Sequence, residues 1–261
     1  MKDLRDKWAI VTGASSGIGS EFVRQLASAG CNVVLVARRE KRLNALAQEL
    51  KAAHAVQTRT LVLDLLSPEA TERLADAVAD IDIDLLVNNA GFGDYGRFAE
   101  IDNQRASRMV QLNIHSLVQL SHRFLPDMLT RKQGAIINVA STSAFQAVPF
   151  MSLYAATKAF VLHFSEGLWA ETRKQGVTVQ ALCPGFTRTE FFDEASLPAS
   201  AAFAVTTVEH VVTNSLKALK KRRPCTVPGW ASYFLTLSNR FVSRRFAVVN
   251  AAKMFNPRKH K

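Results

Sequence analysis

Two side chains that can exchange protons, Tyr154 and Lys158, are four residues apart in an apolar, alanine-rich run that extends to Phe164. This run predicts a helix, and four residues are about one helical turn, so the phenol and the ammonium share a face. A free tyrosine has a pKa of about 10 and is a poor acid or base at neutral pH. A nearby lysine cation favours the phenolate, so we expect Lys158 to lower the pKa of Tyr154 toward the working range. The pair could perform acid–base catalysis, but this spacing is common by chance, so a purely structural role is the alternative for the pair taken alone.

A glycine-rich segment near the N-terminus predicts a site for a dinucleotide. The sequence from Thr12 to Gly19 reads T-G-A-S-S-G-I-G, and it follows the apolar run Trp8–Val11 and precedes the amphipathic stretch Glu21–Ala29. Strand, glycine-rich turn and helix are the context that such a site requires. Glycines let the backbone approach a pyrophosphate, and the helix N-terminus offers unpaired N–H groups. A tight turn without a ligand is the alternative interpretation.

These segments belong to a series whose order and spacing resemble those of the short-chain dehydrogenase/reductase family, from about Trp8 to about Thr189. Beyond Thr189 the resemblance is loose, and the ending is similar to a broadly distributed, poorly characterised branch of the family. The matching motifs are Thr12 to Gly19, Asn88-Asn89-Ala90-Gly91, Asn113, Ser141, Tyr154 with Lys158, and Pro184-Gly185-Phe186-Thr187-Arg188-Thr189.

The resemblance implies a catalytic role for four residues. Tyr154 would give a proton to a carbonyl oxygen while hydride arrives from a nicotinamide, or the reverse, and Ser141 would polarise that oxygen. Lys158 would also hold the nicotinamide ribose, and Asn113 would orient a water that relays protons from Lys158 to solvent. Ser143 is a competing hydroxyl two residues from Ser141. On one strand the two would point to the same face, so we expect Ser143 to assist at the pocket wall.

The resemblance also implies a set of residues around the dinucleotide. Asp64-Leu65 match the family's adenine-contacting pair, with Asp64 on the adenine amino group. The implied cofactor-binding residues are Gly13, Ser15, Ser16, Gly17, Ile18, Gly19, Arg38, Arg39, Asp64, Leu65, Asn89, Ala90, Gly91, Tyr154, Lys158, Pro184, Gly185, Thr187 and Thr189.

The residues after the second expected strand predict NADP as the preferred cofactor. In NAD-preferring relatives an acidic residue ends this strand, whereas here that place is Ala37, followed by Arg38 and Arg39. No carboxylate at that place would repel a 2′-phosphate, and two guanidiniums could pair with it. Ser15 and Ser16 could add hydroxyl contacts. The alternative is that both arginines are solvated at the start of a helix.

Apolar strands and helices alternate along the chain, which predicts a doubly wound parallel sheet, a Rossmann fold, in a single α/β domain. Ligands of such sheets bind at the carboxyl ends of the strands. We expect strands at Trp8–Thr12, Asn32–Ala37, Arg59–Leu63, Leu85–Asn88, Ala135–Ala140 and Val177–Cys183. We expect helices at Glu21–Ala29 with Gly30 as its C-cap, Lys41–Ala53, a segment capped by Ser67, Asn103–Thr130 and Ser152–Lys174.

The composition agrees with one such domain and narrows its chemistry. The chain has 261 residues, of which 48% are apolar, enough for one large core. Cys31, Cys183 and Cys225 are far apart without a C-x-x-C motif, so neither a zinc site nor a disulfide framework is predicted. The six histidines are scattered, and we expect no metal. The charged N-terminus and the lack of any apolar stretch of about 18 residues predict a cytoplasmic protein without a signal peptide or a membrane span.

The net charge of +11 is concentrated near the C-terminus, because His210 to Lys261 holds twelve Lys and Arg and no acidic residue. Residues 230–261 are expected to form a basic extension of the catalytic domain 1–229. From Trp230 to Phe255, aromatic residues recur at helical spacings with arginines between them, which predicts an amphipathic basic helix. Three interpretations stay open: packing on the domain or on another subunit, binding to an anionic membrane surface, or contact with an acidic partner such as an acyl carrier protein or a coenzyme A thioester. No nucleic-acid-binding module is recognised.

The expected substrate loop, about residues 186–208, is rich in large apolar side chains. Together with Phe145 and Phe150 these predict either an apolar pocket for a hydrophobic carbonyl or alcohol, or part of the core. The apolar residues of the loop are Phe191, Phe192, Leu197 and Phe203. A homo-oligomer, dimer or tetramer, is expected. The alternative function is a non-catalytic NADP-binding interaction protein, but such a protein would be expected to lose Tyr154 or Lys158.

Overall fold

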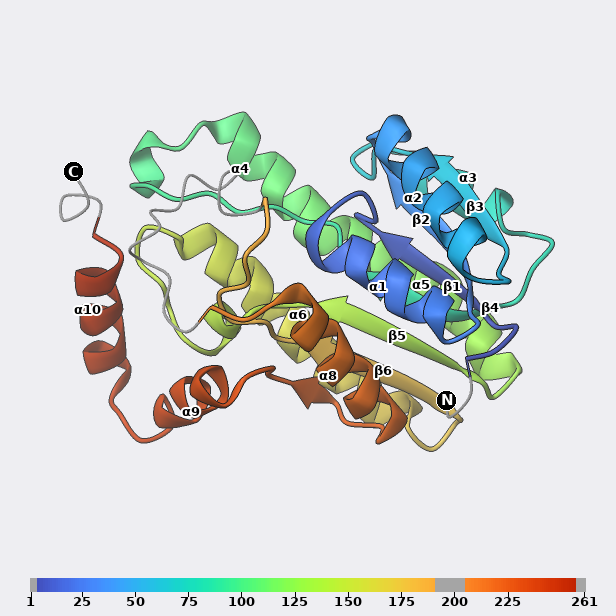
Figure 1. Ribbon diagram of the computed structural model, residues 1–261. Helices are drawn as coiled ribbons and strands as arrows, with labels where there is room; N and C mark the ends of the chain where they lie inside the picture. The colour runs from blue at the N-terminus through green and yellow to red at the C-terminus, as the bar shows by residue number, and fades with distance from the viewer. Residues whose placement is uncertain (1–3, 191–204, 257–261) are drawn as a thin grey trace.

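Parallel strands form the central layer of the protein (Figure 1). The computed structural model describes residues 4–190 and 205–256, and in them the seven-stranded sheet has the order β3-β2-β1-β4-β5-β6-β7. The predicted doubly wound parallel sheet is confirmed. The strands are β1 (Trp8–Thr12), β2 (Asn32–Ala37), β3 (Thr58–Val62), β4 (Ile83–Asn88), β5 (Gly134–Val139), β6 (Val177–Leu182) and β7 (Cys225–Thr226).

Helices cover both faces of the sheet and bury a core on each (Figure 1). Phe22, Leu26 and Leu43 pack on one face, and Leu74, Leu120 and Phe124 on the other. Burial on both sides explains why β1, β4, β5 and β6 are buried along their whole length, as near-continuous apolar runs of a parallel sheet require. The first face carries α1 (Gly17–Ser28), α2 (Glu40–Ala53) and α8 (Val208–Lys220), and the second α3 (Ala70–Asp76), α5 (Leu117–Thr130) and α6 (Ser152–Thr172).

Two caps were predicted from the sequence, Gly30 at the end of α1 and Ser67 at the start of α3. After α1, Gly30 has a φ of +79°, the Gly30 N–H donates to Ala27 and the Cys31 N–H donates to Leu26. This is a Schellman motif with glycine one residue past the C-cap, which confirms the predicted stop. The cap predicted at Ser67 is wrong, because α3 begins at Ala70 and the Ser67 hydroxyl donates to the Glu69 carboxylate instead.

The long helix predicted for residues 103–130 is continuous but not uniform. It consists of α4 (Asn103–Val110), a π-helical segment (Gln111–Ser116) and α5. The π segment adds a residue to the turn that contains Asn113, and such turns are frequent at functional sites. The periodicity of the sequence gave no sign of this irregularity.

The basic C-terminal segment is not the single helix that we predicted. It forms α9 (Trp230–Ser238) and α10 (Arg244–Met254), with a break between them. The Ser243 hydroxyl accepts a hydrogen bond from the Phe246 N–H and so caps α10 at its start. In Figure 1 both helices lie at the end of the sheet where the strands finish, so the extension reaches the ligand-binding edge.

The short strand β7 also brings two cysteines together. Residues 225–226 pair with β6, which places the Cys225 sulfur 3.7 Å from that of Cys183. Both thiols are free in the structure. Their separation of 42 positions along the chain concealed this contact at the sequence level.

Candidate active site

The glycine loop lies between β1 and α1 at the carboxyl end of the sheet. Gly13 and Gly17 have φ values of +65° and +54°, a region that other residues rarely adopt. A Cβ on Gly19 would collide with the carbonyl oxygen of Gly13. The loop therefore needs its glycines to fold so tightly that the backbone itself forms the floor of a ligand site.

Thr12, which the sequence analysis did not single out, joins this loop to β4. Its hydroxyl accepts hydrogen bonds from the N–H groups of Asn89 at 2.9 Å and Ala90 at 3.0 Å. In return the Asn89 amide donates to the backbone oxygens of Thr12 and Gly13 at 2.9 and 3.3 Å. These contacts hold the ends of β1 and β4 together. The only signal in the sequence was the threonine that directly precedes the first glycine.

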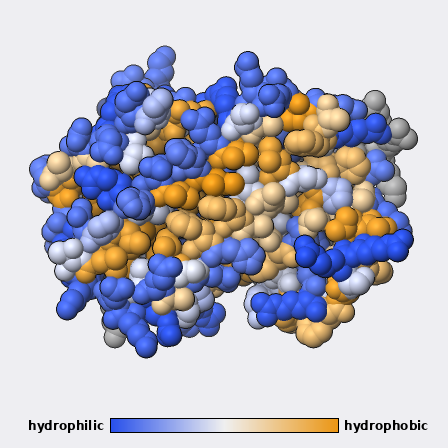
Figure 2. Space-filling model, turned by 180° about the vertical axis from the view of Figure 1, so that it is seen from behind, coloured by the Kyte–Doolittle hydropathy of each residue, from blue (hydrophilic) through white to orange (hydrophobic). Residues whose placement is uncertain are grey.

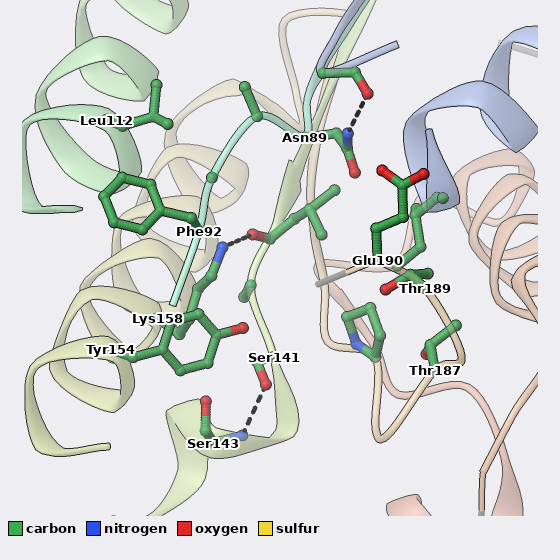
Figure 3. A pocket seen from close by; sticks show the side chains of 18 of the residues that line it. Asn89, Phe92, Leu112, Ser141, Ser143, Tyr154, Lys158, Thr187, Thr189 and Glu190 are labelled. Atoms are coloured by element: carbon green, nitrogen blue, oxygen red, sulfur yellow. Dashed lines mark hydrogen bonds between the residues drawn. The ribbon is translucent and has the colours of Figure 1, made fainter. Parts of the chain in front are cut away.

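Tyr154, Ser141 and Ser143 meet at one end of the cavity (Figure 3). The Ser141 oxygen accepts a 3.1 Å hydrogen bond from the Ser143 N–H, which starts the 3₁₀ turn Thr142–Phe145. We predicted that Ser143 lies on the same strand as Ser141 and points to the same face. Ser143 lies instead in this 3₁₀ turn, after the strand has ended. Its buried hydroxyl has no hydrogen-bond partner among the described residues, so this wall of the cavity retains a donor for a ligand oxygen.

Burial dominates the protonation of Tyr154. Its side chain is 8% exposed, and loss of solvation raises its pKa to about 12, although a hydrogen bond with Ser141 acts in the opposite direction. The predicted net decrease of the Tyr154 pKa toward the working range is therefore wrong, because burial outweighs the effects that favour the phenolate. At neutral pH Tyr154 is a neutral phenol, which is a proton donor.

Lys158 is held by the backbone of β5 and not by the Tyr154 oxygen. Its Nζ donates a 2.7 Å hydrogen bond to the carbonyl of Val139 and lies 5.7 Å from the centre of the Tyr154 ring (Figure 3). The lysine is 6% exposed, and burial lowers its pKa to about 8. Lys158 is therefore mostly charged at neutral pH and loses its proton as the pH rises through about 8.

Asn113 lies behind this cluster and does not line the cavity. Its amide nitrogen donates to the Phe92 carbonyl at 2.9 Å and to the Thr157 hydroxyl at 3.1 Å, while its oxygen accepts from the Phe92 N–H at 3.1 Å. These bonds fix the segment after Gly91 against α6. The contacts give Asn113 a positioning role, and the water relay that we expected stays a prediction.

One cavity of about 350 Å³ collects nearly all the predicted cofactor residues. Of that set, Gly19 alone does not line it, because this glycine packs under the loop. The predicted residues on its wall are Gly13, Ser15, Ser16, Gly17, Ile18, Arg38, Arg39, Asp64, Leu65, Asn89, Ala90, Gly91, Ser141, Tyr154, Lys158, Pro184, Gly185, Thr187 and Thr189.

An anion-binding cluster lies at the end of β2. The Arg39 guanidinium donates to the hydroxyls of Ser15 at 3.0 Å and Ser16 at 2.6 Å, and to the carboxylate of Glu190 at 2.7 Å. Arg42 donates to the other oxygen of Glu190 at 2.6 Å. These bonds hold the pKa of Glu190 below its usual range. Neither Glu190 nor Arg42 was predicted to belong to the site.

The opposite part of the cavity is apolar and is partly built by the C-terminal segment. Phe255 is buried, stacks on Phe186 with 6.3 Å between ring centres, and its carbonyl accepts a 2.9 Å hydrogen bond from Tyr95. Met254 and Leu235 also line the wall. The extension is thus part of the site and not an appendage.

Comparison with known proteins decides the family. Residues 7–199 match the sequence profile described as short chain dehydrogenase. The chain belongs to the short-chain dehydrogenase family. Proteins to which it is similar are named as reductases and dehydrogenases.

Two relatives and one solved structure show how far the similarity of this short-chain dehydrogenase extends. A human very-long-chain 3-oxoacyl-CoA reductase is 36% identical over 70% of the chain, and a chicken hydroxysteroid dehydrogenase-like protein 1 is 31% identical over 84%. The matches span 60% and 67% of these relatives. A short-chain dehydrogenase from Sphingobium yanoikuyae, solved in complex with NADPH, is 33% identical, with a TM-score of 0.82 over 90% of this chain and 93% of that one.

Of the large apolar residues that we predicted for the substrate pocket, the structure describes only two. Phe191, Phe192, Leu197 and Phe203 lie outside the described residues. Phe145 and Phe150 pack in hydrophobic clusters beside the cavity and do not line it. Phe92, Phe186 and Phe255 line it instead. Phe186 lies in the predicted substrate loop. Phe92 and Phe255 could not be selected from the sequence, because they come from distant segments that meet only in the folded chain.

Proposed function

We propose that this protein is an NADP(H)-dependent oxidoreductase that interconverts a hydrophobic carbonyl compound and its secondary alcohol, with Tyr154 as proton donor and acceptor. One observation carries the proposal: Tyr154, Ser141 and Lys158 line one cavity. On one side of them this cavity is lined by the glycine loop with Arg38 and Arg39, which form a cradle, and on the other by an apolar wall. The cradle fits a dinucleotide, and the apolar wall fits a carbonyl substrate.

The dinucleotide, when bound, supplies or accepts the hydride. Tyr154 donates its proton to the carbonyl oxygen in the reductive direction, and its neutral phenol is the required form. Hydroxyls at Ser141 and Ser143 would hold that oxygen while negative charge develops on it. The Lys158 ammonium stabilises the phenolate left behind, since an opposite charge nearby favours the ionised form.

The preference for NADP rests on the cluster around Arg39. Arginine beside the end of the second strand of such a fold accommodates a 2′-phosphate, and Arg39 already makes bonds with Ser15 and Ser16 in the glycine loop. Arg38 also lines the cavity. A bound NADPH in the Sphingobium enzyme is consistent with this choice.

A hydrophobic substrate is supported by the residues that surround the reacting end of the cavity. Val148, Met151 and Phe186 approach it from the body of the protein, and Leu235 and Phe255 from the C-terminal segment. Relatives named for 3-oxoacyl-CoA and hydroxysteroid chemistry suggest long acyl thioesters and steroids as substrate classes to test first.

The test is a scan of NADPH oxidation with purified full-length protein against ketones, aldehydes, 3-ketoacyl thioesters and steroids. We expect turnover with at least one hydrophobic class and little with small polar carbonyls. A protein that binds NADPH but reduces no member of the panel would favour the alternative of a non-catalytic NADP-binding interaction protein.

For the C-terminal segment we propose attachment to an anionic membrane surface. Its inner residues face the cavity, while Trp230 and Phe241 are 79% and 81% exposed and Tyr233, Phe234 and Phe246 are more than half exposed. Exposed rings favour the interfacial region of a bilayer, and basic residues between them favour anionic lipid. In the described residues no helix is long and apolar enough to cross a membrane.

Vesicle sedimentation distinguishes this surface from the other interpretations. Deleting residues 230–261 would remove part of the cavity wall, so point variants are preferable. We expect binding to anionic but not neutral vesicles, weaker binding in salt, and loss of binding when Arg240, Arg244 and Arg245 become glutamine. Absence of vesicle binding, together with capture of an acidic acyl carrier protein, would support the acidic partner instead.

A homo-oligomer also stays a proposal. Viewed from behind, the molecule carries an apolar band across the face on which α5 and α6 lie (Figure 2). Phe160 on α6 is 40% exposed and stacks on Phe164. Sedimentation velocity of the parent and of a Phe160→Asp variant would show whether this face joins subunits.

A further inference from the structure

We propose that Glu190 is a built-in competitor for the 2′-phosphate of NADP, so that this residue sets how strongly the protein prefers NADPH to NADH. The inference rests on the proposed function, because it assumes that the dinucleotide lies along the glycine loop. It assigns a role to a side chain that the glycine, tyrosine and lysine motifs do not include.

The geometry around Glu190 is that of an anion site already filled. Its two carboxylate oxygens accept from separate arginines, Arg39 at 2.7 Å and Arg42 at 2.6 Å. The remaining nitrogens of Arg39 donate to the hydroxyls of Ser15 and Ser16. Two guanidiniums bind this one anion, and one of them is held by two serine hydroxyls. Paired guanidiniums are groups that recognise a phosphate.

The location of the cluster identifies which phosphate is meant. Arg39 follows β2, and Ser15 and Ser16 belong to the loop that precedes α1. In a dinucleotide fold the ribose of the adenosine half lies between these two segments, and the residue after the second strand distinguishes a 2′-hydroxyl from a 2′-phosphate. The carboxylate of Glu190 therefore takes the position that a 2′-phosphate needs.

A 2′-phosphate must consequently break two ion pairs before it gains its own. Both pairs are partly exposed, with side-chain exposures of 39% to 49%, so each is weak and can be displaced. NADH lacks the 2′-phosphate and so has no anionic group at this position to compete for the two arginines. Glu190 thus reduces the affinity for NADPH and leaves that for NADH almost unchanged.

The segment that carries Glu190 also forms the wall of the site. Thr187 and Thr189 line the same cavity, across from Tyr154 and Lys158 (Figure 3). Replacing the carboxylate by a phosphate would therefore release this wall from α2 while leaving the arginines occupied.

The experiment compares dissociation constants measured by nucleotide fluorescence and calorimetry, so it needs no substrate. Wild type, Glu190→Gln and Glu190→Ala are titrated with NADPH, NADH and 2′,5′-ADP. The matched control is Glu49→Gln, which removes an exposed carboxylate bound to Arg24 at 2.7 Å outside the cavity. Melting temperatures confirm that the variants are folded.

We expect both Glu190 variants to bind NADPH and 2′,5′-ADP about two- to tenfold more tightly, with NADH unchanged. The gain should shrink in high salt, because exposed charges are screened, and Glu49→Gln should match the wild type. Unchanged or weaker NADPH binding in both Glu190 variants overturns the inference, and weaker NADH binding would show instead that Glu190 holds a ribose hydroxyl. If the wild type binds neither NADPH nor NADH, the proposed function fails as well.

Discussion

The ammonium of Lys158 donates to the carbonyl of Val139 at 2.7 Å, so the last residue of β5 positions the cation of the proposed active site. The bond spans 19 positions of sequence and fixes the lysine beside the Tyr154 ring. It also explains how a buried lysine is retained here, because a buried ammonium needs a hydrogen-bond acceptor.

Replacing Tyr154 with Phe should abolish most turnover while leaving cofactor binding intact. The change removes only the phenolic oxygen, and general acid–base help is worth roughly 10²- to 10⁴-fold. The measurement is kcat on a verified substrate, with the Kd for NADPH as control. A variant that retains most of its kcat would show that another group donates the proton.

The two directions of the reaction should respond oppositely to pH. Reduction needs the Tyr154 proton and the Lys158 charge, and the pKa of Lys158 is lowered to about 8; reduction should therefore fall as the pH rises through about 8. Oxidation needs the phenolate, and the pKa of Tyr154 is raised to about 12, so oxidation should increase up to the highest pH that the fold tolerates.

Lys158→Met provides the control for this pH dependence. The variant should lose the break near pH 8, bind the cofactor more weakly and have a lower kcat, because the lysine is proposed to serve both functions. Parallel pH profiles for the two directions in the wild type would contradict the assigned roles.

Ser141→Ala should mainly lower kcat, whereas Ser143→Ala should mainly raise KM. Ser141 bonds Tyr154 and caps the 3₁₀ turn, so its loss should lower kcat by about 10²-fold or more. The Ser143 hydroxyl has no partner among the described residues, so its loss should mainly raise KM, by about tenfold or less. Equal effects of the two changes on kcat would place both hydroxyls on the reacting oxygen.

NADPH should exceed NADH in kcat/KM by more than about tenfold, and an acidic residue at the end of β2 should reverse this order. Arg38→Asp is one such change. Arg39→Asp should act more strongly, because Arg39 donates hydrogen bonds to Ser15, Ser16 and Glu190. Equal use of both cofactors by the parent protein would contradict the preference.

The sequence by itself determined the family and the parallel sheet, and nearly all the residues that it predicted for the cofactor line the cavity. β1 and β2 begin and end where they were predicted, because apolar runs between glycine loops and charged helices leave little choice of register. The sequence also predicted the helix end at Gly30 and the tight glycine loop, because their backbone conformations require a residue without a side chain. These features depend on local chemistry and spacing.

Tertiary structure decided what depends on segments distant in sequence. Burial of Tyr154, the hydrogen bond from Lys158 to Val139 and the ion pairs of Glu190 each join elements that only the folded sheet brings together. The C-terminal segment is the clearest case. Its periodicity predicted one amphipathic helix and left open whether that helix packs on the domain. A break after Ser238 lets Phe255 pack into the cavity, because burying that ring requires a cluster that no single segment contains.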